Sequence, residues 1–464
     1  MDMREWTAFL AEPLRDRPVI VAFDPLAGMT RKVANLREWG ARRPLLIARG
    51  LGTGPLPTAD DAEMLVLDAG AATMMSEDVR AMTTLAEDLP PEVVDRVSRY
   101  DPAGEAVWWV GPFVRSGELL GRPVLGGRPA AWAAIEDKTS VDELWAAAGV
   151  EAAPARVVPA DLTDLAAAAA ELGNGDSTVW SGDIRDGING GADYVRWVRT
   201  SEQAREAARF FSANCSRVRV MPFLDGVPCS IHGIVLPDGV AVLRPVELVM
   251  LRDRRRGRFS YAGISTWWDP SAADRCSMRD AARRVGEVLR REVGFRGGFS
   301  LDGVLTAGGF VPTELNSRFS GGLARIARAL PELPMELLQV NLVAGRDAGI
   351  AAAALEELLV PAADANRSGD AIGVSADVRL TETQTVAVVM RGAGFEASTS
   401  DADRTGTVVA GPSAMGAFIR FEPAAGALAQ GERMAPHATA MLAFADATWG
   451  TDFGALEAAP DVRV

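Results

Sequence analysis

The sequence predicts a mixed α/β (α+β) protein in three parts, and three observations support this. Near the N-terminus, short and wholly apolar runs such as 19–23 alternate with helical patterns, which is typical of a buried parallel sheet. From about residue 131, helical patterns are interleaved with paired short runs that indicate antiparallel hairpins. A polar stretch at 364–370 then precedes a last group of expected strands. We therefore expect a parallel-sheet α/β domain over 1–130, an α+β domain over 131–363 and a small α+β domain over 364–464.

The expected elements follow from the length and period of their apolar positions and from the turn residues between them. Short apolar runs predict strands at 19–23, 45–48, 64–67, 107–110, 177–180, 194–198, 218–223, 230–235, 240–249, 299–305, 310–315, 374–380, 385–390 and 407–410. Helical periodicity predicts helices at 132–149 with a break at 136–138, and at 161–172, 201–212 and 279–292. The run 441–444 fits either a strand or a helix.

Composition narrows the class of protein. Of the 464 residues, 48% are hydrophobic and 24% are charged, which is ordinary globular composition. The sequence has no uncharged apolar run of about 20 residues that would predict a membrane span. Its acidic, amphipathic start does not resemble a signal peptide, and its three cysteines lack Cys-x-x-Cys spacing. We therefore expect a cytoplasmic protein with reduced thiols. A net charge of −14 argues against nucleic acid and anionic membranes as partners.

Several kinds of catalytic site are excluded by residue counts. The two histidines, His232 and His437, leave no legible Ser-His-Asp triad and no Cys/His cluster for zinc. A lone His232 on an expected strand is more often structural than catalytic. The glycine-rich segment 50–54 follows a strand, but prolines stand where a phosphate-binding helix would begin, so we interpret it as a turn.

The strongest chemical signal is a set of polar residues on two consecutive expected strands. Asp302 lies on the first strand, and Glu314, Asn316 and Arg318 follow at alternate positions, so those three face one side of the second strand. Two carboxylates and an amide oxygen are hard ligands suited to Mg²⁺, and a forked guanidinium suits phosphate. The alternative is a charged edge strand with a solvated ion pair. The upstream Asp302, the paired glycines and the preceding expected hairpins together favour a metal–phosphate site.

With these residues in place, the chain resembles the ATP-grasp superfamily, especially its carboxylate–amine ligases such as L-amino acid ligases. The resemblance covers about 136–330 and implies a preceding domain like the family's pre-ATP-grasp domain. It implies ATP and Mg²⁺, with two ions, as cofactors, and Asp302, Glu314 and Asn316 as metal ligands. Arg318 would lie near the γ-phosphate, and Lys138 would match the family's phosphate-contacting lysine, although a surface lysine in a helix turn is the alternative.

The resemblance also assigns a phosphate-covering loop to 181–191. Glycines there let backbone N–H groups approach phosphate oxygens, whereas an exposed hairpin is the alternative. The family's second lysine is missing from the strand before the loop, where 180–182 reads Trp-Ser-Gly. Arg185 or a nest of N–H groups would compensate, or the α-phosphate contact would be lost. The expected nucleotide contacts are Gly182, Asp183, Arg185, Gly190 and Gly191.

The hinge that would hold adenine is 219–226. Met221 and Phe223 would form its walls, and because Pro222 has no N–H, Phe223 would supply the donor. Asp225 would bind ribose, although a core strand and turn would look the same. Glu247 matches a family glutamate that faces the nucleotide. The alternative interpretation is that Glu247 is an exposed carboxylate on a strand.

The arginine-rich run 252–258 precedes 261–263 as the family's mobile loop does. We expect anion capture by arginines such as Arg254 and Arg255, against the alternative of a solvated turn.

Together these features predict an ADP-forming ligase that joins small-molecule acid and amine substrates through an acyl phosphate. Two alternatives stay open: activation of a non-carboxylate, enol-type oxygen, and an inactive nucleotide-binding module. A role in secondary metabolism and a homodimer are further expectations from the family.

Overall fold

The computed structural model describes residues 2–68, 70, 72–173, 177–400 and 403–463. The N-terminal part forms a sheet in the order β3-β2-β1-β4-β6-β5, parallel except for the short last pairing. Its central strands are wholly buried, as continuous apolar runs require. The strands are β1 (Val19–Ala22), β2 (Leu45–Arg49), β3 (Glu63–Leu67), β4 (Val107–Val110), β5 (Glu118–Leu119) and β6 (Arg122–Leu125), with helices α1 (Met3–Leu10), α2 (Leu26–Glu38), α3 (Met75–Glu87) and α4 (Pro91–Tyr100).

The central part begins with two short helices and a small antiparallel sheet in the order β7-β10-β8-β9. The helix expected at 132–149 is broken at the Glu136 turn as predicted, into α5 (Ala130–Ala134) and α6 (Val141–Ala147). Helices α7 (Leu162–Gly173) and α8 (Ser201–Asn214) pack on this sheet through Phe211 and Trp180. Its strands are β7 (Arg156–Pro159), β8 (Thr178–Gly182), β9 (Val195–Val198) and β10 (Arg217–Pro222).

A long sheet of eleven strands forms the body of the molecule and runs on into the C-terminal part. Strand β13 pairs with β16 from Gly263 to Ser265, so the two parts share one sheet across the expected boundary at 363/364. The strand order of this long sheet is β15-β14-β11-β12-β13-β16-β20-β19-β17-β18, with β21 beside β12. The central strands are β11 (Val227–Leu236), β12 (Gly239–Asp253), β13 (Arg258–Ser265), β14 (Gly297–Thr306) and β15 (Gly309–Asn316), and the C-terminal ones are β16 (Gly369–Ser375), β17 (Gln384–Arg391), β18 (Gly394–Ala397), β19 (Gly406–Ser413), β20 (Gly416–Pro423) and β21 (Glu457–Ala458).

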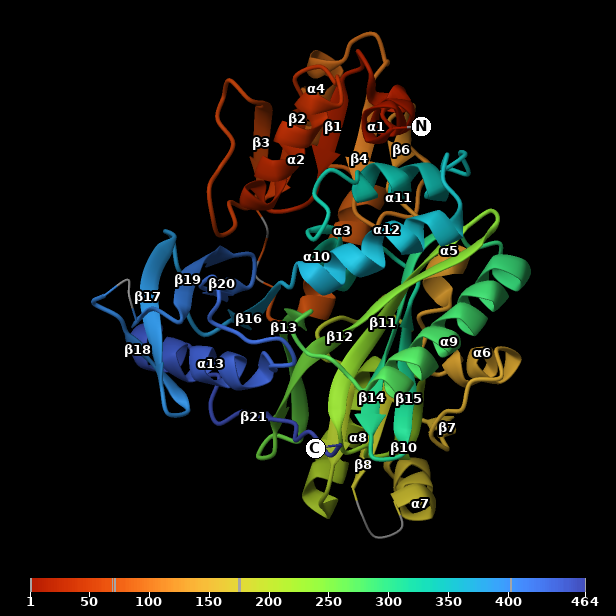
Figure 1. The fold of residues 1–464 in the computed structure, drawn as a ribbon, viewed down its shortest axis with the longest axis vertical. Helices are drawn as coiled ribbons and strands as arrows, with labels where there is room; N and C mark the ends of the chain where they lie inside the picture. Colours follow the sequence, from red (N-terminus) through yellow and green to blue (C-terminus); the bar gives the residue numbers. More distant parts are fainter. Residues whose placement is uncertain (1, 69, 71, 174–176, 401–402, 464) are drawn as a thin grey trace.

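Helices cover this sheet at each end. Helix α9 (Ala272–Val288), which ends in a π-turn (Leu289–Val293), packs on β11 and β12. Helices α10 (Gly321–Ala327), α11 (Met335–Val343) and α12 (Ala352–Ala365) lie between the long sheet and the N-terminal domain (Figure 1). The run 441–444, open between strand and helix in the sequence, lies inside α13 (Ala435–Trp449), whose buried residues pack on β16, β18 and β20.

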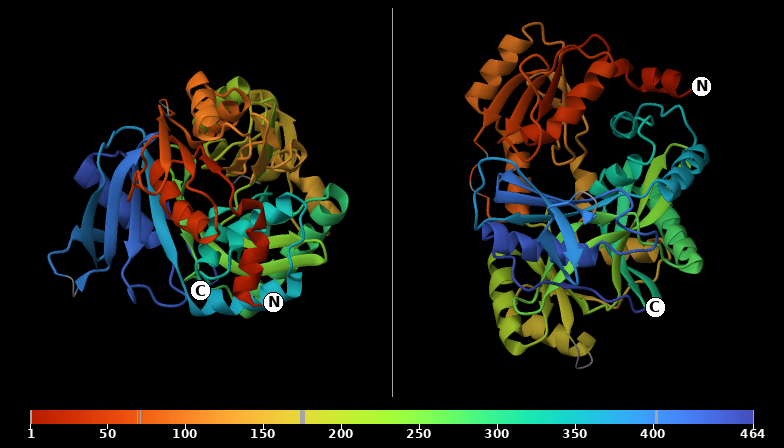
Figure 2. Two further views of the ribbon diagram at one scale, coloured as in Figure 1. Left: turned by 90° about the horizontal axis from the view of Figure 1, so that it is seen from above. Right: turned by 60° about the vertical axis from the view of Figure 1, so that its left-hand side comes forward.

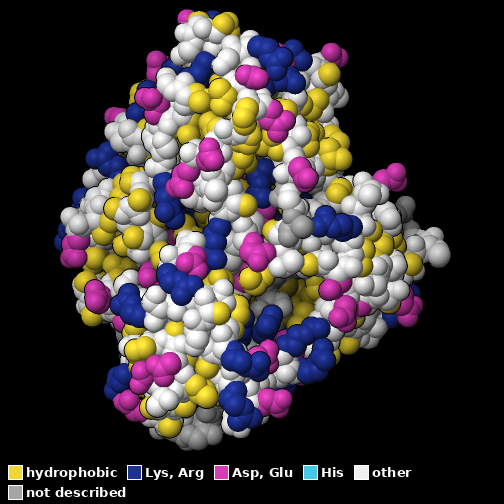
Figure 3. Space-filling view, turned by 180° about the vertical axis from the view of Figure 1, so that it is seen from behind, with side chains coloured by type: hydrophobic (Ala, Val, Ile, Leu, Met, Phe, Trp, Pro, Cys, Tyr) yellow, Lys and Arg dark blue, Asp and Glu magenta, His cyan; other side chains and the backbone are white. Residues whose placement is uncertain are grey.

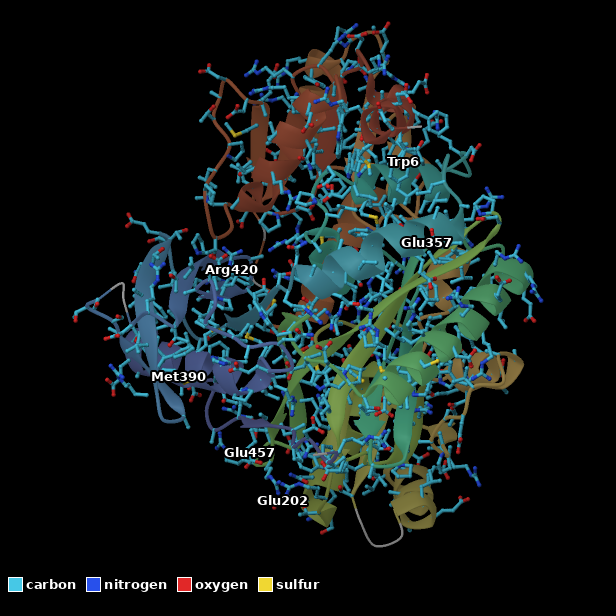
Figure 4. All side chains as sticks on the ribbon, in the orientation of Figure 1. Trp6, Glu202, Glu357, Met390, Arg420 and Glu457 are labelled. Atoms are coloured by element: carbon cyan, nitrogen blue, oxygen red, sulfur yellow. The ribbon has the colours of Figure 1, made fainter. Side chains whose placement is uncertain are left out.

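The N-terminal sheet and helix α7 lie at opposite ends of the molecule, with the long sheet between them (Figure 2). The N-terminal helix is fixed to the body of the molecule by Trp6, whose indole N–H donates to the carbonyl of Ala348 at 2.7 Å (Figure 4). In the described part of the chain, no helix is long and apolar enough to cross a bilayer.

Candidate active site

A cleft of about 490 Å³ opens between the small sheet, the long sheet and the N-terminal domain. Seen from behind, the surface is hollowed below its centre, and Lys and Arg side chains gather along the lower edge of that hollow (Figure 3). Of the residues expected to act, the cleft is lined by Lys138, Gly190, Gly191, Met221, Phe223, Asp302, Glu314, Asn316 and Arg318. The cleft is therefore where most of the expected site residues meet.

The three expected metal ligands lie together on β14 and β15. Asp302 is the cross-strand partner of Glu314, and a register shift follows Asp302. The amide nitrogen of Asn316 donates to Asp302 Oδ2 at 2.9 Å, so its amide oxygen is the atom it could offer a cation. From β11, the hydroxyl of Ser230 donates to Asp302 Oδ1 at 2.6 Å. The fold thus brings two carboxylates and one amide to one point.

The close negative charges of Asp302 and Glu314 favour the binding of a cation between them. Burial and the neighbouring charge of Glu314 raise the pKa of Asp302 to about 6, because two close carboxylates resist ionising together. The ammonium group of Lys138 already lies 2.9 Å from Glu314 Oε1. Lys138 therefore balances part of the negative charge of Asp302 and Glu314.

Arg318 is held at the edge of the cleft by a buried carboxylate. Glu136 pairs with both Arg318 and Arg128, and its carboxylate also accepts the backbone N–H of Ser317 at 2.9 Å. Burial alone would raise the pKa of Glu136, but the two arginines outweigh it and hold that pKa below its ordinary value. The guanidinium of Arg318 also lies 5.5 Å from the ring centroid of Phe113. Glu136 and Phe113 thus fix the orientation of the Arg318 side chain.

The glycine-rich loop, defined here as residues 183–194 between β8 and β9, is docked on helix α3. Its Gly190 and Gly191 line the cleft, and an added Cβ at either would lie 3.2 Å from a Met75 side-chain atom. The carboxylate of Asp193 accepts from Ser76, and Arg80 of α3 donates to the Asn189 side chain at 2.5 Å. The N-terminal domain therefore positions this loop over the cleft.

Three residues expected in this loop region do not line the cleft. Gly182 faces α8, where an added Cβ would lie 2.4 Å from Cys215 Sγ. The buried carboxylate of Asp183 accepts the backbone N–H groups of Ser216 and Arg217. Arg185 turns outward and pairs with its neighbour Asp186 at 3.0 Å. The nucleotide contacts expected of these three residues are therefore not supported by their positions. Instead, the three residues help to hold β8, α8 and β10 together.

The expected hinge lies at one end of the cleft, and one detail differs. Met221 and Phe223 line the cleft as walls, and the Phe223 ring stacks on Trp197 at 4.6 Å between centroids. The backbone N–H of Phe223, however, already donates to the carbonyl of Ser177 at 3.0 Å. The expected donor to adenine is therefore used in strand pairing.

The basic group at this end of the cleft is Arg252. Its guanidinium lies 2.7 Å from Asp225 Oδ1 and 4.9 Å from the ring centroid of Phe223. Asp225 itself does not line the cleft, so its expected contact with ribose is not supported by its position. Arg254 and Arg255 are exposed in the β12–β13 turn and do not line the cleft either.

Arg254 instead reaches outward. It pairs at 2.6 Å with Glu457 of β21, at the outer side of the molecule (Figure 4). The expectation that Arg254 and Arg255 capture an anion is corrected, because the strand alternation points Leu248, Met250 and Arg252 into the cleft and places the turn beyond it.

Glu247 is corrected in the same way. Its wholly buried carboxylate accepts the backbone N–H of Met434 at 2.5 Å and the Arg433 side chain at 3.0 Å. It points to the opposite side of β12 from Leu248 and binds the start of helix α13. It therefore joins the C-terminal part to the long sheet and does not face the cleft.

His232 lines the cleft from β11 but is packed as a neutral side chain. Burial lowers the pKa of His232 to about 3, and its Nδ1 has no hydrogen-bond partner among the described residues. An added Cβ at Gly322 would lie 2.1 Å from His232 Nε2. The imidazole and the start of α10 are therefore in close contact.

Sequence reasoning missed the residues that reach the cleft from the N-terminal domain. Met75, Val79 and Phe113 belong to a helix and a loop that no motif singled out. Glu136 stands two residues before Lys138, and that nearness was the one signal in the sequence for its role. Ser230 carried no signal, since its contact with Asp302 depends on strand register.

Comparison with solved structures fits this arrangement. The fold resembles the biotin carboxylase domain of a 2-oxoglutarate carboxylase from Hydrogenobacter thermophilus, with a TM-score of 0.57 and 14% identity over 96% of this chain and 91% of that chain. It also resembles an L-amino acid ligase from Bacillus licheniformis, with a TM-score of 0.53 and 14% identity over 88% and 94% of the two chains. The chain has the ATP-grasp fold.

A third ATP-grasp likeness is partial. Pyruvate carboxylase from Rhizobium etli matches with a TM-score of 0.52 and 14% identity over 88% of this chain and 36% of that larger chain. The sequence itself matches no protein-family model and no curated protein. At this level of identity, the fold is what the ATP-grasp likeness establishes.

Proposed function

We propose that this chain is an ATP-dependent carboxylate–amine ligase that forms an amide bond through an acyl phosphate. One observation carries the proposal: Asp302, Glu314, Asn316, Lys138 and Arg318 meet in a single cleft of an ATP-grasp fold. Among the solved neighbours, the 2-oxoglutarate carboxylase domain is described in complex with MgADP and bicarbonate, and another is an L-amino acid ligase. Both names are consistent with the proposed ATP-dependent ligase chemistry.

The side chains fit a nucleotide with divalent metal. Among the described residues, no group of three or more His, Cys, Asp or Glu side chains could hold a metal alone. Two carboxylates and an amide oxygen suit Mg²⁺ that completes its shell with phosphate and water. We propose that Asp302, Glu314 and Asn316 would hold Mg²⁺, as two ions if the family resemblance extends to the metal number. The metal would neutralise phosphate charge.

The protein's own groups supply position and charge. The ammonium of Lys138, 2.9 Å from Glu314 Oε1, would donate to a phosphate oxygen of a bound nucleotide. Arg318, fixed by Glu136, would stabilise the γ-phosphoryl group as a substrate carboxylate oxygen attacks phosphorus and the bond to ADP breaks. The glycine-rich loop would cover the phosphates and exclude water.

In the second step the amine nitrogen attacks the acyl carbon. The carbon–oxygen bond to phosphate breaks, inorganic phosphate leaves, and the nitrogen loses a proton to water or phosphate. Arg318 lies where it could stabilise the negative charge of the tetrahedral intermediate and of the leaving phosphate. The products are an amide, ADP and phosphate.

The test is acid-dependent ADP release, with hydroxylamine added to trap an acyl phosphate as a hydroxamate. Glu314→Gln should abolish both signals without lowering thermal stability by more than a few degrees. Glu332→Gln changes an exposed glutamate outside the cleft and serves as the matched control. Full turnover in Glu314→Gln would refute the metal assignment. Nucleotide binding without ADP release, across a broad panel of acids, would indicate a binding module instead.

A further inference from the structure

The cleft has an apolar wall beside Arg318. Met75 and Val79 project from α3, Phe113 follows β4, and Ile188 comes from the glycine-rich loop, and all four line the cleft. Val79 and Ile188 are buried together, with Met75 and Phe113 packed against them. We call these four residues the acyl wall.

The acyl wall adjoins the place where the acid would react. Arg318 lies over the Phe113 ring, with 5.5 Å between the guanidinium carbon and the ring centroid. At the other end of the wall, Met75 packs against Gly190 and Gly191 of the loop expected to cover the phosphates. A carboxylate held by Arg318 would therefore direct the remainder of its molecule along this wall.

The acids that line the cleft already have partners. Asp193 accepts from Ser76, Asp302 accepts from Ser230 and Asn316, and Glu314 pairs with Lys138. Among the described residues that line the cleft, no further Asp or Glu is present to receive a substrate ammonium group. An ammonium group placed against the acyl wall would lose water without gaining a counter-charge, which is strongly unfavourable.

We propose that, given the ligase activity proposed above, the acid substrate is a monocarboxylic acid with an apolar remainder and no α-ammonium group. The acyl wall selects it by burying that remainder. Branched and aromatic acids fit this chemistry better than the corresponding amino acids. The inference thus separates this chain's acid from the amino acid named for the ligase neighbour.

Matched pairs of acids test the proposal. We expect 4-methylpentanoate to exceed leucine, and 3-phenylpropanoate to exceed phenylalanine, by at least about tenfold in kcat/KM for hydroxamate formation with the whole protein, ATP and Mg²⁺. Equal or greater activity with the amino acids would overturn this inference and leave the ligase proposal standing. No hydroxamate with any acid would overturn both.

A variant tests the wall itself. Met75 is half-buried, so Met75→Asp places a carboxylate in the wall at modest cost to folding. The leucine to 4-methylpentanoate ratio of kcat/KM should rise at least about tenfold, whereas Met75→Leu should keep the wild-type ratio. Thermal unfolding checks that Met75→Asp is folded. An unchanged ratio in folded Met75→Asp would contradict the role of the wall, and if the variant does not fold, the wild-type pairs still decide.

Discussion

The carboxylate of Asp193 accepts two hydrogen bonds from Ser76, one from its backbone N–H at 2.8 Å and one from its hydroxyl at 2.9 Å. These bonds tie the glycine-rich loop to the first turn of α3 in the N-terminal domain. A loop that covers phosphates must be both mobile and correctly placed. The contact would therefore couple the proposed covering of the nucleotide to the N-terminal domain, which supplies Met75, Val79 and Phe113 of the acyl wall.

Asp193→Ala should loosen this loop. Two lost hydrogen bonds, one of them to a backbone N–H, are worth about 1–3 kcal/mol, so KM for ATP should rise by roughly 5- to 150-fold. Cleavage by a protease within the loop should become faster in the same variant. Asp186→Ala is the matched control, because Asp186 lies in the same loop and pairs only outward, with Arg185. Equal effects of the two variants would argue against a special role for the Ser76 contact.

Arg252 is the arginine of the run 252–258 that lines the cleft, whereas the sequence had favoured Arg254 and Arg255. Its buried guanidinium lines the cleft beside Phe223. Arg252→Ala should raise KM for ATP about tenfold or more, since it removes a cation that lies against the Phe223 wall of the cleft. Steady-state kinetics with varied ATP measure this.

The same arginine run supplies the controls. Arg254→Ala and Arg255→Ala change exposed residues outside the cleft, so kcat/KM should stay within about twofold of wild type. A large loss in either control would mean that the β12–β13 turn moves onto the substrate during turnover.

The predictability of this site depended on strand geometry. Asp302, Glu314 and Asn316 could be placed together from sequence because two adjacent strands and a period of two determine which side chains share a face. The same rule applied to β12 places Leu248, Met250 and Arg252 on one face and Glu247 on the other. Arg254 shares the parity of the first three but lies beyond the end of β12, in the turn. The charge density of the run 252–258 is greatest in the turn, where charged side chains are usually solvated.

Contacts between distant segments were beyond the sequence. Ser76 and Asp193 are brought together by packing of the N-terminal domain on the central part, and Glu136 and Arg318 by the tertiary fold of the central part, which no local pattern encodes. The polar stretch at 364–370 predicts a boundary before the C-terminal strands, whereas β16 pairs directly with β13 and extends the same sheet. The parallel sheet of the N-terminal part and the antiparallel hairpins of the central part were predictable, because both follow from local apolar periodicity.

Glu136→Gln should destabilise the fold in a pH-dependent way. The change leaves buried Arg128 and nearby Arg318 without their shared counter-charge, which at pH 7 costs about 3–5 kcal/mol of unfolding free energy. The pKa of Glu136 is held below its ordinary value of 4.5 when folded. Its stabilisation is therefore present above pH 4.5 and is lost as pH falls through the lower, folded pKa.

Thermal unfolding across pH measures this difference. The gap in Tm between wild type and Glu136→Gln should be constant near neutrality and should narrow in acid. Glu171→Gln is the control, because Glu171 forms an exposed pair with Arg156 and should cost less than about 1 kcal/mol. A gap that widened in acid would contradict the depressed pKa.

Gly322→Ala should destabilise the protein through His232. The new Cβ would lie 2.1 Å from Nε2 and 2.3 Å from Cε1 of the buried ring, so either α10 or the imidazole must move, at a cost of about 1–3 kcal/mol. Gly321→Ala is the neighbouring control, because its Cβ would lie 3.9 Å from the Tyr261 hydroxyl, an ordinary van der Waals contact. It should change stability by less than about 1 kcal/mol.

A double-mutant cycle identifies the cause. His232→Ala removes the ring that Gly322→Ala would strike, so the double variant should be more stable than the sum of the two single losses predicts, by about 1 kcal/mol or more. Chemical denaturation of the four proteins gives this coupling energy. Simple additivity would show that the glycine is required for the backbone of α10 and that His232 does not determine its size.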